Sequence, residues 1–413
     1  MRKLIVPMTI LLIIVSCASQ KESIRIEQRI QRIENGLVEM SSPSLAEQFS
    51  TERVKKANKV TLADRMTHYN VPGVSIALIN DYKVEWAKGY GVVKAGSDKP
   101  VTPETCFEAA STTKLLTSAA ALHYLEQGMF DLDEDVNQEL KSWKIPENEF
   151  TQKEKVTLRL LLTHQSGLTR PDGGFSEEEG SVPTLLQVLN GEAPAKNQAA
   201  FVEYVPGFKH QYSNMGYIVI QLLLEDVIGK PYPKIVQETI FGPVGMKNTT
   251  VVHPLNAEFK NNVALPHDGE GNSYDRPQHP TALGHAALVT SPADLALFTI
   301  ELIRAYQGKS NRIVSQKTVK RMFSAQLEID PNQFFGLSGQ GLGAFLMGAG
   351  ENFYFTYPGH NAPGATCMLI ASPGTGKGAV IMTNGVNGLQ LSLEILAALG
   401  NEYDWLPVQY DVD

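Results

Sequence analysis

The sequence predicts an α+β fold of the α/β sandwich type, in which both ends of the chain build one antiparallel β-sheet and an all-helical region is inserted between them. Two β-rich runs, at residues 74–93 and 366–385, indicate the sheet. Between them, segments with helical periodicity end at Gly or Pro residues. We therefore expect a sheet region at about 24–115 and 285–413, flanked by helices, and a helical insert at about 116–284.

The first 17 residues have the organisation of an export signal. Two basic residues precede a short apolar run, residues 4–15, and the small Ser16 stands before Cys17. Such a run is too short to be a permanent membrane span. Residues 14–17 resemble the lipobox of bacterial lipoproteins, in which the cysteine is lipid-modified and becomes the new N-terminus. We expect residues 1–17 to be a lipoprotein signal peptide, the alternative being an ordinary signal peptide with an incidental cysteine.

This interpretation predicts an extracytoplasmic protein that is held at the membrane only through the lipid on Cys17. Residues 18–23 would form a short polar tether, and residues 24–413 the folded domain. Apolar residues recur at helical spacing from Ile26 to Leu37 with charged residues between them, so an amphipathic helix should follow the tether directly. The domain would then lie close to the membrane.

The strand runs carry turn signals of their own. The run at 74–93 turns at Asn80-Asp81, which is typical of a β-hairpin. The C-terminal run at 366–385 contains "SPGTGKG", which resembles a phosphate-binding loop but stands between two short strands without the following Ser/Thr and helix. We interpret it as a turn. A last helix is expected at about 389–399.

Charge and cysteine usage exclude several classes of function. The net charge is −8 and acids and bases are scattered along the chain, so no basic stripe would gather a nucleic acid. Apart from Cys17, the cysteines are Cys106 and Cys367, which are far apart and lack the Cys/His spacing of a metal site. We therefore expect no metal. Sequence leaves open whether these two cysteines pair.

The segment "FEAASTTKLL" places Ser111 three residues before Lys114 at the start of an apolar helix. Residues three apart lie on one helical face, so the amine lies one turn from the hydroxyl. Unpaired N–H groups and the helix dipole favour an oxyanion there. Burial would lower the pKa of Lys114, and a neutral amine accepts the serine proton. Because Ser-x-x-Lys occurs by chance about once or twice in such a chain, the alternative is a serine N-cap beside a surface lysine.

A second proton-handling group stands about one hundred residues later, in "FKHQYSNMGY". Tyr212 is a poor base at its free pKa of about 10, but a neighbouring cation can bring it into range. Asn214 offers both a donor and an acceptor, which suits contacts to Lys114 and to a substrate amide. The alternatives are an aromatic anchor in a loop for Tyr212 and a helix cap for Asn214.

With Ser111-x-x-Lys114 followed by Tyr212-x-Asn214, the chain resembles the penicillin-recognising serine hydrolases, specifically the class C β-lactamase-like family with its esterase and D-aminopeptidase relatives. The resemblance covers nearly the whole mature chain and includes "VPGVSIALI", "LLTHQSGL", "IFGPVGMKNTT", "HAALVTSPADLALF" and "AVIMTNG" in the expected order. It implies a β-lactamase/transpeptidase-like fold. It also implies that Ser111 is the acylated nucleophile, Lys114 its proton acceptor, Tyr212 the base that later activates water, and Asn214 a contact for lysine and substrate.

The sequence departs from this family at its third motif, Lys-Thr-Gly or His-x-Gly on the strand beside the cleft. The equivalent stretch is "FTYPGHNAPGATC", where no Lys or His stands two before a Gly. One placement makes Tyr357 and Gly359 the motif, with the His360 N–H as oxyanion donor and the His360 side chain at the rim. The other begins at His360 and puts Pro363, which has no N–H, at the donor position. We prefer the first placement, because Pro363 could not supply the N–H that the second placement requires. In the first placement Gly359 also lets substrate pass close to the strand.

The resulting hypothesis is an exported serine hydrolase that forms an acyl-enzyme on Ser111 without metal or cofactor. Its substrate would be a small-molecule or peptide ester or amide, cell-wall fragments included, because the third motif lacks the cation that would hold a carboxylate. The alternatives within the family are a true β-lactamase, a D-Ala-D-Ala carboxypeptidase and a D-aminopeptidase. The non-enzyme alternative is a peptidoglycan-binding surface protein. His164 and His285 lie in family-like segments and are expected to be structural.

Overall fold

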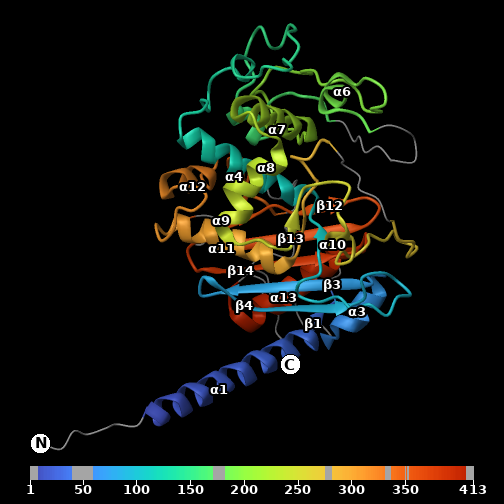
Figure 1. Ribbon diagram of the computed structural model, residues 1–413, viewed down its shortest axis with the longest axis vertical. Helices are drawn as coiled ribbons and strands as arrows, with labels where there is room; N and C mark the ends of the chain where they lie inside the picture. Colours follow the sequence, from blue (N-terminus) through green and yellow to red (C-terminus); the bar gives the residue numbers. More distant parts are fainter. Residues whose placement is uncertain are drawn as a thin grey trace, which may run out of the picture.

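A nine-stranded antiparallel sheet is the main element of the computed structural model, which describes residues 8–39, 59–170, 182–274, 281–330, 336–348, 350 and 353–405 (Figure 1). Its strands are β3 (Gly73–Asn80), β4 (Lys83–Gly91), β8 (Leu327–Glu328), β9 (Gly339–Gln340), β10 (Phe345–Met347), β11 (Tyr354–Thr356), β12 (Gly359–Asn361), β13 (Ala365–Ser372) and β14 (Lys377–Thr383). The order is β4-β3-β14-β13-β11-β10-β9-β8, and β12 also pairs with β13. Because β3 from the first part of the chain pairs with β14 from the last, the predicted fold class is confirmed.

Two hairpin turns lie side by side at the ends of neighbouring strands of this sheet. Asp81 and Tyr82, between β3 and β4, both have the positive φ of a tight turn. Tyr82 N donates to Gly376 O at 3.0 Å, in the turn between β13 and β14. A Cβ on Gly376 would come within 2.7 Å of the Tyr82 ring, so glycine is required there. Both predicted turns are confirmed, including the one in "SPGTGKG".

The helical insert separates the two groups of strands. Its helices are α4 (Thr113–Glu126), α5 (Leu158–Leu162), α6 (Leu185–Asn190), α7 (Asn214–Ile228), α8 (Tyr232–Val236), α9 (Gly242–Val244) and α10 (Ala257–Lys260), with the short turns η1 (Ala110–Thr112), η2 (Val136–Gln138) and η4 (Gln237–Phe241). A small sheet of β5 (Phe107–Glu108), β7 (Val289–Thr290) and β6 (Thr249–Thr250) joins this region to the main sheet.

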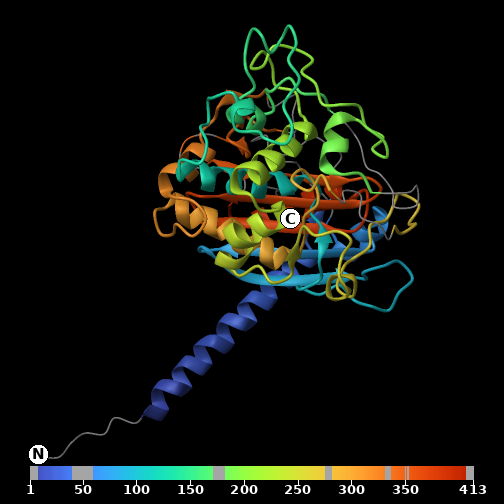
Figure 2. The same ribbon diagram turned by 45° about the horizontal axis from the view of Figure 1, so that its top comes forward.

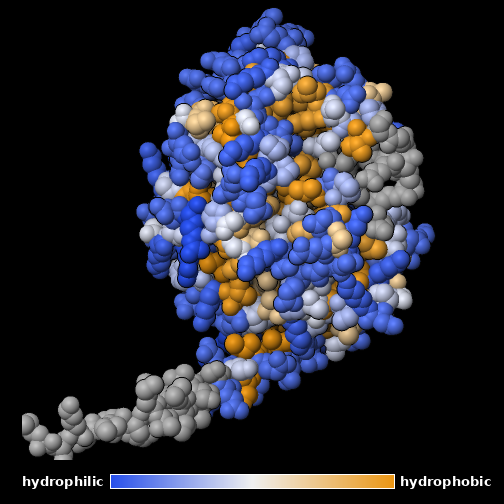
Figure 3. All heavy atoms as spheres, in the orientation of Figure 1, coloured by the Kyte–Doolittle hydropathy of each residue, from blue (hydrophilic) through white to orange (hydrophobic). Residues whose placement is uncertain are grey.

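Helices cover both faces of the main sheet. α11 (Pro292–Tyr306), followed by α12 (Gln316–Met322), packs on β3, β4 and β14, whereas α13 (Gly388–Tyr403) packs on β13 and β14. Successive side chains of a strand point to opposite faces. Every residue of β3 except Asn80 is buried, which requires cover on both sides. Hydrophilic side chains form most of the outer surface in Figure 3, with smaller apolar patches between them.

The first helix, α1 (Met8–Glu34), projects from the domain in both ribbon views (Figures 1 and 2). It is continuous through residues 18–23, the predicted tether, where Lys and Glu are good helix formers. Its second half docks on the domain through buried Ile30 and Ile33 and through a 2.6 Å ion pair between Arg32 and Glu402. Strand β1 (Leu37–Val38) follows and pairs with β2 (Lys59–Val60). Among the described residues, no helix has the length and apolar character to cross a membrane.

A buried ion pair ties α3 (Leu62–His68) to α13. Arg65 binds Glu394 through two hydrogen bonds of 2.8 Å, and the Tyr69 hydroxyl donates to the same carboxylate at 2.8 Å. The Glu394 side chain is 0% exposed and that of Arg65 is 6% exposed. A bidentate pair with an additional donor satisfies a buried carboxylate well.

Glu394→Gln should therefore destabilise the fold strongly, because it removes the buried counter-charge of the Arg65 guanidinium and leaves only the exposed Glu39 carboxylate, at 3.3 Å, beside it. We expect a loss of about 3–5 kcal/mol in the free energy of unfolding, measured by urea denaturation at unchanged m-value. Glu402→Gln is the matched control, since its shortest ion pair is with Arg32, which is 56% exposed, and its second, with Arg29, is longer at 3.5 Å. It should cost at most about 1 kcal/mol. Equal losses in the two variants would contradict the prediction.

Candidate active site

Ser111 lies in the turn η1 between β5 and α4, at the helix start that the spacing predicted. Thr113 fixes this turn, because its Oγ1 donates to Ala110 O at 2.6 Å and accepts from Leu288 N at 3.0 Å. Ala110 has a φ of 47°, a conformation that residues other than glycine rarely adopt. Surrounding packing therefore holds the turn, and it leaves the Ser111 side chain half-buried at the start of α4.

Lys114 follows one helical turn later and is 0% exposed. Its Nζ lies 3.1 Å from Ser111 Oγ and donates to the His285 carbonyl oxygen at 2.8 Å. Burial, with a smaller contribution from the charge of Arg170, lowers the pKa of the Lys114 amine well below its ordinary value. A neutral amine beside a serine hydroxyl can accept its proton.

Tyr212 approaches Ser111 from the loop before α7, and its hydroxyl donates to Ser111 Oγ at 2.8 Å. Lys114 Nζ lies 5.0 Å from the centre of its ring, and the Arg170 guanidinium carbon lies at 5.5 Å. Burial nevertheless raises the pKa of Tyr212 above its ordinary value, although hydrogen bonds to Ser111 and Tyr357 and the charge of Arg170 oppose this. The charge of Arg170 acts in the expected direction, but desolvation outweighs it, so the net shift in the pKa of Tyr212 is upward.

His164 is a buried residue at the back of this site. Its Nδ1 accepts the Ser213 N–H at 3.2 Å, and its Nε2 lies 2.9 Å from the Tyr357 hydroxyl. The ring centre lies 4.4 Å from that of Tyr212. Burial first, and then the neighbouring Lys114, lowers the pKa of His164 well below its ordinary value, so the ring is neutral.

Sequence reasoning missed the position of His164 beside the reacting groups. Its polar partners stand 49 and 193 residues away in the chain, so no local pattern reveals them. The unusual local feature of His164 is its backbone φ of 57°, just after α5, and this conformation is not readable from the sequence alone.

Asn214 is the first residue of α7, and the cap is its neighbour Ser213, whose side chain accepts from Gly216 N. Among the described residues, Asn214 Oδ1 is buried and has no hydrogen-bond partner. The expected contact between Asn214 and Lys114 is not formed, since Lys114 Nζ bonds Ser111 and the His285 carbonyl instead. Asn214 thus keeps a buried acceptor for another group.

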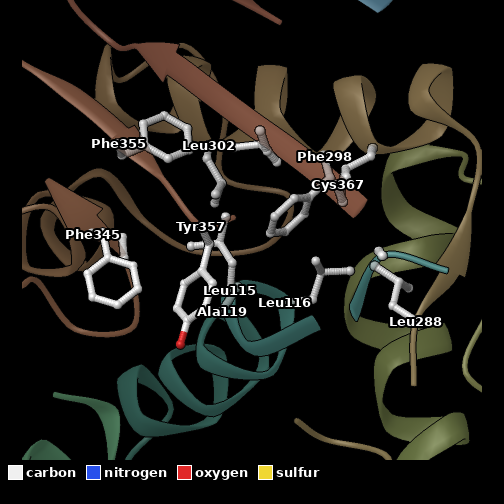
Figure 4. Packing of buried hydrophobic residues seen from close by; sticks show 14 of the residues in the cluster. Leu115, Leu116, Ala119, Leu288, Phe298, Leu302, Phe345, Phe355, Tyr357 and Cys367 are labelled. Carbon is white, nitrogen blue, oxygen red and sulfur yellow. The ribbon is translucent and has the colours of Figure 1, made fainter. Parts of the chain in front are cut away.

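The third-motif segment lies directly against the turn that carries Ser111. Thr112 Oγ1 donates to Tyr357 O at 2.8 Å, and a Cβ on Gly359 would overlap the Ala109 carbonyl oxygen. Gly359 is therefore required for packing against η1, which differs from the expectation that it makes room for substrate. The Tyr357 side chain is fully buried, and Figure 4 shows its hydroxyl directed away from the sheet. The His360 side chain is exposed.

Asn361, the last residue of β12, extends this contact to β5. Its Nδ2 donates to Glu108 Oε2 at 2.9 Å, and burial raises the pKa of the Glu108 carboxyl. Glu108 also lines a cavity of about 430 Å³ that Ser111 does not line. This cavity is separate from the Ser111 site.

The part of the chain that the structure describes contains no group of three or more His, Cys, Asp or Glu residues that could hold a metal ion. Cys106 and Cys367 are both buried and are not joined to each other. Burial raises the pKa of each thiol to about 12, so both are poor nucleophiles. The open question of their pairing is thus answered.

Comparison with known proteins gives one family. Residues 59–400 match the family model described as Beta-lactamase. The N-acetylmuramyl-L-alanine amidase of Bacillus subtilis is 25% identical over 381 residues, which cover 82% of each chain. A putative D-alanyl-D-alanine carboxypeptidase of Escherichia coli O157:H7 is 27% identical over 328 residues, covering 72% of this chain and 74% of the relative.

Solved structures share the fold. The octameric penicillin-binding protein homologue from Pyrococcus abyssi superposes with a TM-score of 0.65 at 25% identity, over 84% of this chain and 78% of the other. The D-amino acid amidase from Ochrobactrum anthropi SV3 gives a TM-score of 0.66 at 23% identity, over 83% of this chain and 97% of the other. The second likeness shows the fold alone.

Proposed function

This chain belongs to the beta-lactamase family and is a serine hydrolase, and we propose that it works through an acyl-enzyme on Ser111. One observation carries the proposal: Ser111 Oγ lies 3.1 Å from the buried amine of Lys114 and 2.8 Å from the Tyr212 hydroxyl. Because burial lowers the pKa of the Lys114 amine and raises that of the Tyr212 hydroxyl, the serine has a base and an acid beside it.

In acylation, Ser111 Oγ attacks the substrate carbonyl carbon and its proton passes to Lys114 Nζ. When the bond to the leaving group breaks, Tyr212 gives its hydroxyl proton to that group. The acyl-enzyme therefore carries an ammonium on Lys114 and a phenolate on Tyr212. These opposite charges stabilise each other in a site from which water is largely excluded.

In deacylation, a water molecule gives a proton to the Tyr212 phenolate and its oxygen attacks the acyl carbon. The acid leaves as Lys114 returns its proton to Ser111 Oγ, which restores the resting enzyme. Tyr212 is thus first an acid and later a base, as microscopic reversibility requires of one group on both half-reactions.

The oxyanion site would combine the N–H of Ser111 with that of His360. This corresponds to the third-motif placement that begins at Tyr357, which the burial of Tyr357 and the exposure of the His360 side chain support. Neither Tyr357 nor Gly359 brings a cation to that motif, so we propose uncharged esters and amides as the preferred substrates. Asn214 Oδ1, buried without a partner among the described residues, is suited to accept a substrate amide N–H.

The names of the relatives point to amides of the cell wall as the natural source of such substrates. Parallel assays with a short-chain aryl ester, a chromogenic cephalosporin and a D-Ala-D-Ala peptide separate the candidates. Preference for the ester supports our proposal, whereas faster turnover of the cephalosporin or the peptide would assign a β-lactamase or a carboxypeptidase.

We further propose that the protein is exported and anchored outside the cytoplasm by a lipid on Cys17. Mass spectrometry of the mature protein should find a diacylated N-terminal Cys17, and Cys17→Ser should release the protein from the membrane fraction. A mature chain that lacks the lipid would contradict the proposal.

Ser111→Ala should abolish turnover of every substrate, because it removes the nucleophile. We expect a fall in kcat of more than about 10⁴-fold, since removal of a nucleophilic serine leaves only binding and oxyanion stabilisation. A fluorophosphonate probe should label the parent at Ser111 and not the variant. Labelling of both to the same extent would overturn the assignment.

Lys114 should determine the acidic limb of the pH profile. The neutral amine is the active form, so kcat/KM rises as the pH increases through the lowered pKa of Lys114. Lys114→Arg keeps a cation that never deprotonates, and we expect it to lower kcat/KM by about 10²–10⁴-fold at all pH values. Thermal unfolding of the variant checks that the fold is kept, and a parent-like pH profile would contradict the role of Lys114.

A further inference from the structure

The cavity of about 430 Å³ beside the small sheet has no role in the mechanism proposed for Ser111, which does not line it. Glu108 of β5 and Val289 of β7, which pair in this sheet, form its inner side. Val289 is buried there and Glu108 is half-buried. Cavities of this size accommodate small molecules, and an apolar lining with a few polar groups is typical of such sites. The cavity thus has the properties of a second binding site.

Backbone hydrogen bonds join the walls of this cavity. Leu265 N donates to Val93 O at 2.9 Å, which ties the segment after α10 to the loop after β4. Ala264 N donates to Cys106 O at 2.8 Å, which ties the same segment to the start of β5. Because the walls are already ordered, a ligand would not have to order them when it binds.

The charged side chains of the lining differ in sign between its inner and outer sides. Lys94, Lys99 and Lys260 are exposed and line the outer side. Glu108, on the inner side, is the one acidic residue among the described residues of the lining. Three cations around one opening attract an anionic group, and a carboxylate accepts hydrogen bonds from ammonium groups.

The Glu108 carboxyl has room for a further partner. Asn361 Nδ2 donates to its Oε2 at 2.9 Å, and within the described part of the chain no other hydrogen bond reaches this carboxyl. Burial raises the pKa of Glu108, because the loss of water penalises its charged form and the bond from Asn361 compensates only in part. A cation placed beside Glu108 would supply the missing stabilisation.

Most of the remaining lining is apolar. It includes Val93, Val263, Leu265, Pro266 and Val289. An aliphatic chain that lies against these side chains is removed from water, and each buried methylene group adds to the affinity.

We propose that this cavity binds a small aliphatic amino carboxylate, whose ammonium group contacts Glu108 and whose carboxylate lies among Lys94, Lys99 and Lys260. The apolar walls cover the chain that joins the two charged groups. This site is distinct from the Ser111 site and adds a second ligand to the protein beyond the hydrolysed substrate.

Isothermal titration calorimetry of the full-length protein with ε-aminocaproate, caproate and hexylamine tests the proposal. The three probes have the same carbon chain and differ in their end groups. ε-Aminocaproate should bind at least about tenfold more tightly than either of the others, because each of those lacks one charge-assisted contact. Equal affinities, or no binding of ε-aminocaproate, would overturn the proposal.

Glu108→Gln locates the ammonium end of the probe. It removes the charge but keeps an oxygen that can accept from Asn361, and it should weaken ε-aminocaproate about tenfold, to the affinity of caproate. Glu104→Gln is the matched control, because Glu104 is exposed and does not line the cavity. It should bind all three probes as the parent does, and an equal loss of affinity in the two variants would contradict the role of Glu108.

The double variant Lys94→Gln/Lys260→Gln locates the carboxylate end and decides the matter if Glu108→Gln does not fold. Both side chains are exposed, and Lys99 is kept because its amine also donates to the Asn261 carbonyl oxygen. We expect affinity for ε-aminocaproate to fall by about threefold or more and affinity for hexylamine to stay unchanged. Parent-like affinity for ε-aminocaproate would overturn the proposal. None of these measurements depends on turnover at Ser111, so their failure leaves the proposed hydrolase mechanism intact.

Discussion

Burial of the Lys114 amine is the constraint on which the rest of the site depends. An amine with no exposed surface favours its neutral form, and a neutral amine needs an acceptor for its N–H and a donor for its lone pair. The acceptor is the His285 carbonyl, from the segment before β7, and Ser111 Oγ, in the turn before α4, lies 3.1 Å from Nζ. The helical insert and the small sheet must therefore pack over α4 in a single arrangement. That arrangement places Tyr212 and Tyr357 in the same site.

Sequence predicted the parts of this arrangement that depend on short spacing. Ser111 and Lys114 are one helical turn apart, and helical geometry alone places their polar atoms together. The hairpins were predictable for a similar reason, because turn residues between apolar runs determine the pairing of neighbouring strands. The place of Tyr212 followed from a resemblance in motif order rather than from local physics.

The remaining features depend on packing between distant segments. The sequence predicts only a structural role for His164. The folded chain places the Ser213 N–H and the Tyr357 hydroxyl at its two ring nitrogens. The sequence predicts that Gly359 makes room for substrate. In the structure, Gly359 instead lets β12 pack against Ala109. The sign of the shift in the pKa of Tyr212 depends on how completely its neighbours exclude water, which no spacing rule conveys.

The contact of the buried amine with a backbone carbonyl has a consequence for how such a site can diverge. The His285 carbonyl, which accepts from Lys114 Nζ, is a group that every residue type supplies equally. A side-chain substitution at position 285 therefore leaves this acceptor in place. Selection for a new substrate can alter the side chains around the cleft while the partner of the buried amine is inherited with the backbone.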